Sequence, residues 1–323
     1  MAKKRKTASK SSNHRKFINI LLLLFVAVCS IGLLWQSNPD YFNAQYRKLK
    51  KEFTASQDSL LDLPTPPKKE NKKENQKENK KESQKADQPV TANLRSIKGL
   101  NTAADLKDRP SEVVRHTGYV VSFNSKGKVP NWVGWELTKV ETTGDSKRTN
   151  RFIADPKIKS QQATSADYSR SGYDRGHMAP AGDMSWSTTA MKESFYFTNM
   201  CPQAPNLNRG IWKSLEDQTR EWAKRDSAIY VICGPVIKGG EKTIGPNKVI
   251  VPTQFYKVIL SPYGKKPKAI GFLFDNDGSL EQLSRFAVSV DSVEKLTGID
   301  FFHGLPDSVE NVVEGSFKLN EWF

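Results

Sequence analysis

The sequence contains few residues that bind transition metals or form disulfides. It has three cysteines and four histidines in 323 residues, and it lacks His-Glu-x-x-His, paired Cys-x-x-Cys and EF-hand patterns. A zinc site built from several histidines and cysteines is therefore disfavoured. Residues 95–323 also lack a Gly-rich phosphate loop and internal repeats. A hard ion such as Mg²⁺ fits this inventory best, because it needs only one or two protein oxygens and keeps most of its waters.

The first 35 residues contain no acidic side chain. Residues 1–16 carry seven Lys and Arg, and residues 17–35 form an uncharged apolar run of 19 residues. A helix of that length spans about 28 Å, close to the thickness of a hydrocarbon core. No small-residue cleavage site follows, so we expect a transmembrane signal anchor. The basic block predicts a cytoplasmic tail over 1–16, with the rest of the chain outside the cytoplasm.

Residues 36–94 lack a sustained apolar face and are predicted to be a charged, low-complexity, disordered linker. Within them, residues 68–87 carry eight Lys, four Glu and one Asp in a near-repeat of four residues. In a helix the Glu side chains would stack at i, i+4 and repel one another, which favours a solvated tether. A tail that binds nucleic acid or a wall polymer is the alternative. It is weaker, because Glu alternates with Lys and the near-repeat has no aromatic residue to stack on bases.

Residues 95–323 are predicted to fold as one α+β domain. Strand and helix patterns do not alternate regularly, so a mixed or antiparallel sheet with flanking helices is expected. The net charge of residues 88–323 is +5, which suits a phosphate-rich substrate without requiring one. Cys233 lies in an apolar run and is expected to be a buried thiol. The predicted strands are 116–124, 131–140, 228–237, 249–260 and 269–275, and the predicted helices are 210–224, 291–296 and 308–313.

Elimination among the histidines leaves one candidate for chemistry. His14 belongs to the N-terminal tail, and His116 is expected to begin a strand. His303 lies in Phe-Phe-His-Gly, an apolar setting typical of a packed core. His177 ends an Asp-Arg-Gly-His sequence in a turn-like segment. By itself that tetrapeptide is also compatible with a structural salt bridge and turn.

A second segment, residues 198–220, brings an amide, a carboxylate and a guanidinium into one pattern. Asn208 lies just ahead of the best predicted helix, and Glu216 and Arg220 follow it by eight and twelve residues. Spacings that are multiples of four keep side chains on one side of a helix. The alternative is an N-cap asparagine followed by a surface Glu–Arg pair, and spacing alone does not decide between the two.

Taken together, the two segments resemble the DNA/RNA non-specific endonuclease family. The resemblance runs from about residue 95 to the C-terminus. Cys201 inside the second motif, and the N-terminal anchor and linker, are departures from the family pattern. The matching motifs occur in order and at the family's spacing: Asp174-Arg175-Gly176-His177, Asn199-x-x-Pro202-Gln203, Asn206-Leu207-Asn208, Trp212 and Leu215-Glu216.

The resemblance implies a ββα-metal (His-Me finger) core and a metal-dependent endonuclease that cleaves DNA and RNA without sequence or sugar preference. By the same resemblance His177 is the general base, and Asn208 is the direct ligand of one Mg²⁺, with Mn²⁺ as an alternative ion. Glu216 is expected to hold metal-bound water.

Arginines are expected to neutralise phosphate charge at this site. Arg220 matches a phosphate-side arginine of the family, and an arginine upstream of Asp155-Pro156 should join it. Arg151 is our choice for that position, with Arg148 as the alternative. Arg175 is expected at the phosphate or paired with a structural carboxylate. Two residues complete the expected site. Asp174 is expected to support the imidazole, with a nearby backbone carbonyl as the alternative, and Asn199 is expected at the substrate.

Two other functions remain compatible with the sequence. One is a membrane-anchored nucleic-acid-binding receptor without catalysis, and the other is a metal phosphodiesterase with a different substrate. The expected partners are DNA or RNA and, through residues 17–35, a membrane. Oligomeric state is left open, with a homodimer among the options.

Overall fold

The computed structural model describes Leu94, residues 97–263 and residues 266–323. The predicted cytoplasmic tail, membrane anchor and all but the last residue of the linker therefore lie outside the described residues. Among the helices that the structure does describe, none combines the length and apolar character needed to cross a bilayer.

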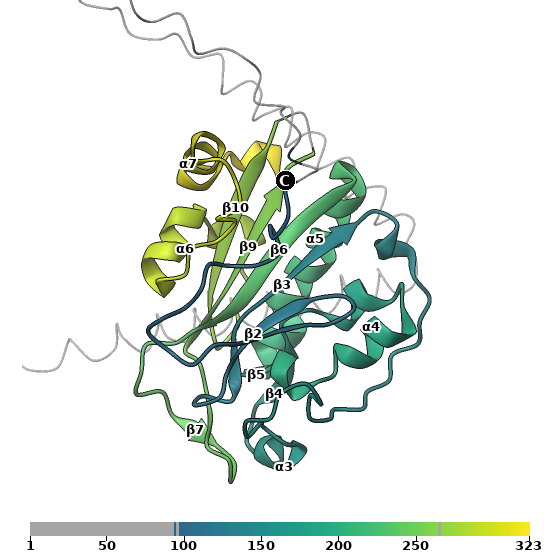
Figure 1. The fold of residues 1–323 in the computed structure, drawn as a ribbon, viewed down its shortest axis with the longest axis vertical. Helices are drawn as coiled ribbons and strands as arrows, with labels where there is room; N and C mark the ends of the chain where they lie inside the picture. Colours follow the sequence, from purple (N-terminus) through teal and green to yellow (C-terminus); the bar gives the residue numbers. More distant parts are fainter. Residues whose placement is uncertain (1–93, 95–96, 264–265) are drawn as a thin grey trace, which may run out of the picture. The chain divides into compact units, whose positions relative to one another are not determined.

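A seven-stranded sheet forms the centre of the domain (Figure 1). Its strand order is β1-β2-β3-β6-β9-β10-β11, and every pair is antiparallel. The middle strand β6, AIYVICGPV, is buried along its whole length, so both of its faces need apolar side chains. The strands of this sheet are β1 (Glu112–Arg115), β2 (Val120–Asn124), β3 (Val129–Thr138), β6 (Ala228–Val236), β9 (Gln254–Ser261), β10 (Lys268–Asp275) and β11 (Ala287–Val288).

The two faces of the sheet pack against different helices. One face, with Trp135 and Phe255, shares a core with the long helix α5 (Trp212–Asp226). The other face shares a core with α6 (Val290–Thr297) and α7 (Asp307–Gly315). Alternate residues of a strand point to opposite faces, which is why neighbouring residues belong to different cores. The sheet therefore separates α5 from α6 and α7.

A small hairpin lies on the α5 side, made of β4 (Asp174–His177) and β5 (Met200–Gln203). A π-helical turn at Leu207–Ile211 follows it and continues into α5. Hairpin and helix form the expected ββα unit. The remaining short elements are α3 (Ser165–Tyr168), α4 (Thr188–Glu193), β7 (Thr243–Ile244), β8 (Val249–Ile250) and 3₁₀ turns at Glu141–Thr143, Ala181–Met184, Phe197–Asn199, Leu283–Phe286 and Leu319–Glu321.

The α+β class, the antiparallel sheet and the long elements are confirmed, with four local differences. His116 lies in the turn after β1 rather than in a strand, and Asp174–His177 is a strand rather than a turn. The predicted strand 249–260 is divided into β8 and β9, because Pro252 interrupts it. The long helix begins at Trp212, since the backbone of Gly210 (φ −100°, ψ −114°) leaves the helical region.

Candidate active site

His177 occupies the last position of β4, where the hairpin places it against the rest of the domain. Strand alternation puts its side chain on the same face as that of Arg175, and opposite that of Asp174. Gly176 faces β5, where an added Cβ would collide with the Gln203 side chain. The Nε1 of Trp212 donates to the His177 carbonyl oxygen (3.3 Å). The first residue of α5 is therefore joined to the end of β4.

The His177 imidazole is almost enclosed, with the whole residue 8% exposed. Its ring lies edge-on to Phe195 (centroids 4.9 Å apart) and near Phe152 (5.7 Å). Its Nε2 is buried and has no hydrogen-bond partner among the described residues. Burial, and then the charges of Arg148 and Arg175, lower the pKa of His177 to about 3. The free protein therefore holds a neutral imidazole with an uncommitted nitrogen at ordinary pH.

Asp174 supports Asn208 rather than the imidazole. Its Oδ2 accepts a hydrogen bond from Asn208 Nδ2 (2.9 Å), and Arg209 donates to both of its oxygens (2.8 and 2.7 Å). The predicted contact between Asp174 and His177 is therefore corrected, because the two side chains leave β4 on opposite faces. The bond to Asp174 orients the Asn208 amide and leaves its oxygen without a partner among the described residues.

Glu216 lies one turn along α5 from Trp212, on the same side of the helix. It is half-buried and forms no hydrogen bond or ion pair with a described residue. Burial raises its pKa to about 7, against the opposing charges of Lys257 and Arg220. Asn208 itself belongs to the π-helical turn, so the single helical face expected for Asn208, Glu216 and Arg220 is replaced by a kinked segment.

The unpartnered groups of the ββα unit fit a hard divalent cation. They are the Asn208 amide oxygen and the Glu216 carboxylate, both oxygen donors, with the neutral imidazole of His177 on the neighbouring strand. Asn208 and Glu216 are only partly buried, so both oxygen donors are open to a ligand or to water. Two oxygen donors suffice for Mg²⁺, which retains most of its water shell.

The arginines near His177 are not all those expected. Arg148 packs over the Phe195 ring (5.1 Å) and Arg175 over the Phe152 ring (4.1 Å), the two rings that contact the imidazole. Arg148 rather than Arg151 is thus the upstream arginine with contacts to this site. Arg151 is exposed and forms no ion pair with a described residue.

Arg220 is committed to an internal ion pair. Its Nη1 donates to the fully buried Asp183 (2.7 Å), and its Nη2 donates to Asp217. The same Asp183 also accepts a bond from Trp135 Nε1 (3.2 Å). The Arg220 guanidinium therefore neutralises Asp183, and its expected role at the phosphate stays a prediction.

Asn199 is a structural residue. It is fully buried, its Oδ1 accepts from the Ala179 backbone N–H (2.9 Å), and its Nδ2 donates to the carbonyls of Ala179 and Ser194 (2.8 Å each). These bonds fix the chain immediately after His177. The expected contact of Asn199 with substrate is corrected, since no part of its side chain reaches the surface.

Other sequence expectations also change. His303 is exposed, because Phe301 and Phe302 fill the core beside it. The His116 side chain is buried, with its Nε2 2.8 Å from Asp155 Oδ2. Cys201 and Cys233 are free buried thiols, as expected for Cys233.

Sequence analysis missed Lys257, although a charge inside an apolar strand was a visible signal. Lys257 is fully buried in β9, and its Nζ has no hydrogen-bond partner among the described residues. The ammonium lies over the rings of Trp212 (4.5 Å) and Trp135 (5.5 Å), on the side of the sheet that faces α5. Its charge offsets those of Glu216 and Asp183.

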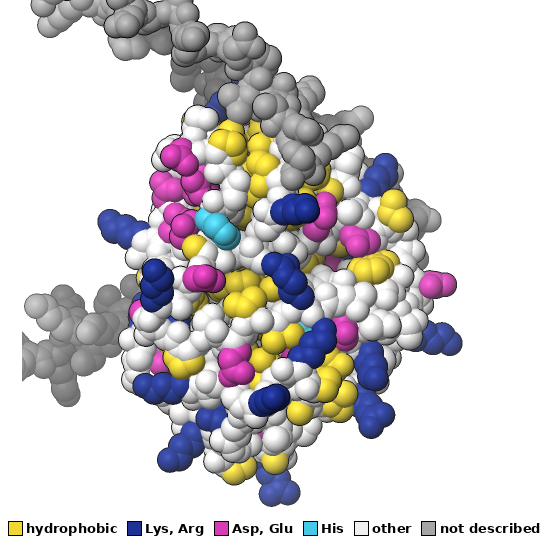
Figure 2. Space-filling view, in the orientation of Figure 1, with side chains coloured by type: hydrophobic (Ala, Val, Ile, Leu, Met, Phe, Trp, Pro, Cys, Tyr) yellow, Lys and Arg dark blue, Asp and Glu magenta, His cyan; other side chains and the backbone are white. Residues whose placement is uncertain are grey.

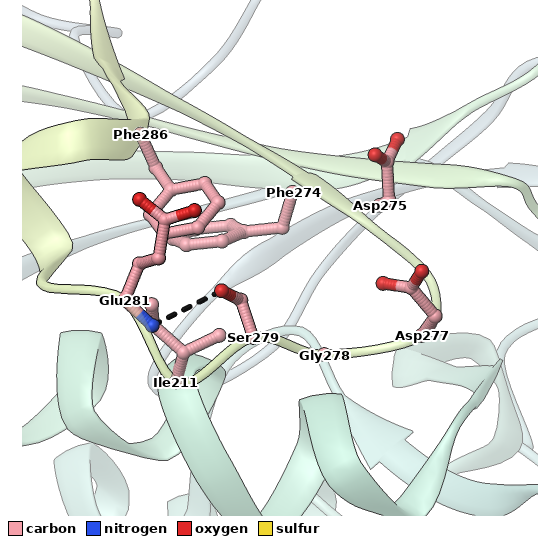
Figure 3. A pocket seen from close by; sticks show the side chains of 8 residues that line it. All are labelled: Ile211, Phe274, Asp275, Asp277, Gly278, Ser279, Glu281 and Phe286. Atoms are coloured by element: carbon pink, nitrogen blue, oxygen red, sulfur yellow. Dashed lines mark hydrogen bonds between the residues drawn. The ribbon is translucent and has the colours of Figure 1, made fainter. Parts of the chain in front are cut away.

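A pocket of about 230 Å³ lies beside the start of α5, but its chemistry does not suit a phosphate (Figure 3). Ile211, Phe274 and Phe286 form its apolar part, and three carboxylates line the remainder. None of the residues described above as unpartnered lines it. Electrostatic repulsion would exclude a nucleic-acid backbone. The carboxylates belong to Asp275, Asp277 and Glu281.

The ββα unit and the central sheet lie within a segment that matches a known protein family. A family model described as DNA/RNA non-specific endonuclease matches residues 101–308. The chain belongs to the DNA/RNA non-specific endonuclease family. Members of this family are endonucleases, enzymes that hydrolyse phosphodiester bonds.

Several named relatives are nucleases. Nuclease EXOG, mitochondrial, from Mus musculus is 38% identical over 216 residues, which cover 61% of this chain and 59% of that protein. Nuclease C1 from Cunninghamella echinulata var. echinulata is 40% identical over 221 residues, covering 63% and 85%. Endonuclease G, mitochondrial, from Homo sapiens is 34% identical over 218 residues, covering 63% and 71%. The chain thus spans about three fifths of the length of mouse EXOG.

A solved structure of EndoG in complex with EndoGI, described under the mechanism of EndoG inhibition, has the same fold. The identity is 33% and the TM-score 0.57, over 62% of this chain and 89% of that chain. The α+β fold with its antiparallel sheet is therefore the EndoG fold. The inhibitor in that structure is a partner of EndoG.

Proposed function

We propose that this chain is a divalent-metal-dependent endonuclease that hydrolyses phosphodiester bonds of DNA and RNA, with His177 as its general base. The observation that supports this best is the buried, neutral His177 imidazole, whose Nε2 has no partner. A neutral imidazole with a free nitrogen can accept a proton from water. His116, whose side chain is also enclosed, differs because its Nε2 lies 2.8 Å from Asp155 Oδ2.

The two arginines near His177 would prepare the base for catalysis. Arg148 and Arg175 both lower the pKa of His177 through their positive charge. A phosphate placed between them would cancel part of that effect, so substrate binding would raise the pKa and make the imidazole a stronger base. The water that attacks phosphorus would transfer its proton to the His177 imidazole as the bond to phosphorus forms.

Asn208 and Glu216 are the residues proposed to hold a divalent cation. The Asn208 oxygen would bind it directly, and the Glu216 carboxylate would accept hydrogen bonds from its waters. When bound, Mg²⁺ or Mn²⁺ would stabilise the negative charge that develops on the leaving oxygen. Asp174 keeps the Asn208 oxygen available by accepting from the amide nitrogen.

Sequence preference is expected to be weak. The candidate substrate contacts are arginines that can bind backbone phosphate, and such contacts carry no direct information about base sequence. Binding should weaken steeply with salt, because phosphate neutralisation releases counterions.

The test compares His177→Ala with His303→Ala, a histidine substitution at an exposed site, in the purified full chain. Supercoiled DNA and a structured RNA are incubated with Mg²⁺ or with EDTA. We expect His177→Ala to lower the cleavage rate by about 10²–10⁴-fold, and His303→Ala to leave it unchanged. Cleavage that persists in EDTA, or is equal in His177→Ala and the unsubstituted chain, refutes the proposal. Tight DNA binding without product would favour a non-catalytic receptor.

We also propose that residues 17–35 anchor the chain, with the nuclease domain outside the cytoplasm. The uncharged run behind a basic block supports this topology. Protease accessibility of the domain in intact cells tests it, because protection of the domain would contradict the orientation.

A further inference from the structure

Acidic side chains gather on the face of the domain formed by α6 and α7 (Figure 2). Asp291 and Glu294 belong to α6, and Glu314 to the last turn of α7. One carboxylate oxygen from each lies within 4.8 Å of the other two. The central sheet separates this cluster from the ββα unit, because α6 and α7 pack on the face opposite α5.

The innermost member of the cluster has no partner. Glu314 is only 4% exposed, and its Oε1 is buried without a hydrogen bond from any described residue. No basic side chain forms an ion pair with the three carboxylates in residues 97–263 or 266–323. A buried carboxylate normally requires a cation or several hydrogen bonds. The cluster therefore combines close negative charges with an unsatisfied oxygen.

The end of α7 adds to the negative potential. Asp291 reaches this end, since a Cβ on Gly315 would lie 3.6 Å from Asp291 Oδ2. The C-terminus of a helix carries partial negative charge and unpaired carbonyl oxygens, and the last turn of α7 has no basic side chain. These carbonyls are further oxygen donors of the kind that bind hard cations.

We propose that Asp291, Glu294 and Glu314 form a Ca²⁺ site that stabilises the packing of α6 and α7, separate from the nuclease chemistry. Ca²⁺ binds oxygen ligands at 2.3–2.6 Å, so ligands on opposite sides of the ion are about 4.6–5.2 Å apart. The three carboxylate oxygens lie within 4.8 Å of one another, so a single Ca²⁺ can reach all of them. Mg²⁺ requires opposite ligands about 4.0–4.2 Å apart in a nearly ideal octahedron, and this is harder to reach with three side chains from two helices.

The degree of exposure also suits Ca²⁺. Asp291 is exposed, Glu294 is half-buried and Glu314 is buried. Glu294 Oε1 accepts from the Phe301 backbone N–H (2.7 Å), which fixes this side chain while its second oxygen is uncommitted. An ion here would be held from the protein side and hydrated from the solvent side. Water would complete the six to eight ligands that Ca²⁺ prefers.

A proton is the competing occupant. Burial and the neighbouring carboxylates raise the pKa of Glu314 to about 9. A protonated Glu314 would satisfy the cluster without any metal, and Ca²⁺ would then have no effect on it. The two occupants therefore predict different responses to Ca²⁺.

The experiment measures thermal unfolding and calorimetric Ca²⁺ binding of the full chain after EDTA treatment and dialysis. Glu314→Gln preserves the shape of the side chain and removes its charge. Asp307→Asn is the matched control, because it removes an exposed carboxylate from the first turn of the same helix. Asp291→Asn is a second test at an exposed position, where loss of folding is not a concern.

We expect Ca²⁺ at a hundredfold excess over its Kd to raise the Tm of the unsubstituted chain and of Asp307→Asn by about 5–10 °C. Glu314→Gln should melt higher than the unsubstituted chain in EDTA, since repulsion is relieved, and should bind one Ca²⁺ fewer with no such rise. Asp291→Asn should weaken Ca²⁺ binding at this site at least about tenfold. An equal rise in Glu314→Gln would assign Ca²⁺ to another site, such as Asn208, and overturn the proposal. No rise in any protein would identify the proton as the occupant and also overturn it.

Discussion

Asp174→Asn tests whether this carboxylate acts through the metal-binding side chain rather than through the histidine. In the folded chain Asp174 accepts a hydrogen bond from Asn208 Nδ2 at 2.9 Å. An asparagine at position 174 could instead donate to Asn208, which would allow the Asn208 amide to rotate and turn its nitrogen toward the ion. We therefore expect the Mg²⁺ concentration for half-maximal cleavage to rise, with little change in the pH dependence due to His177.

The magnitude follows from the role of Asp174 as a support for a ligand. Loss of such supports typically lowers metal affinity or activity about 10–100-fold, which corresponds to roughly 1.4–2.7 kcal/mol. The ion pair of Asp174 with Arg209 contributes less, since the Arg209 side chain is 72% exposed and exposed pairs are worth about 0–1 kcal/mol. Arg209→Ala is thus the matched control, because it removes the ion pair and retains the bond to Asn208.

The assay is the initial rate of plasmid nicking over a Mg²⁺ titration, with the pH profile measured at saturating Mg²⁺. We expect Asp174→Asn to shift the Mg²⁺ midpoint about 10–100-fold, and Arg209→Ala to shift it only slightly. If Asp174→Asn leaves the Mg²⁺ midpoint unchanged but alters the acid limb of the pH profile, Asp174 acts on His177 and the reasoning is refuted. Equal shifts in both variants would assign the effect to charge rather than to orientation of the amide.

Three further outcomes are expected. Burial raises the folded pKa of Glu216 from 4.5 to about 7, so the free energy of unfolding should decline as pH rises between those values. Relative to the unsubstituted chain, Glu216→Gln should therefore be more stable at pH 8 than at pH 4 by roughly 1–3 kcal/mol, measured by urea unfolding. An effect of the substitution that does not vary with pH would contradict this. Folding lowers the pKa of His177 from 6.5 to about 3, so the unfolded chain binds a proton at this histidine at higher pH than the folded chain does. The free energy of unfolding should therefore decrease as pH falls from 6.5 to 3, and the Tm of His177→Gln should fall less over this range. An identical dependence of Tm on pH in both proteins would contradict a buried, neutral His177. Asn199→Ala should lower the free energy of unfolding by about 1–3 kcal/mol, since it strands backbone groups of Ala179 and Ser194, whereas an unaltered stability with reduced DNA affinity would restore the substrate-binding role.

Much of the fold was predictable because its strongest signals are local. The apolar strand 228–237 and the helices near 291–296 and 308–313 were placed within about two residues of their observed bounds. The beginning of α5 was misplaced, because the π-helical turn depends on the backbone of Gly210 and on Trp212 bonding to the His177 carbonyl. That bond joins residues 35 positions apart, which periodicity does not reveal.

The sequence by itself determined the class of the domain, its family motifs and the choice of His177 among four histidines. These depend on residue types and short spacings, which survive without knowledge of long-range contacts. Only the tertiary structure decided what Asp174, Asn199 and Arg220 do, because each is defined by a partner distant along the chain: Asn208, Ala179 and Asp183. The same is true of the acidic cluster on α6 and α7, whose residues are separated by up to 23 positions and meet only when both helices pack against the sheet.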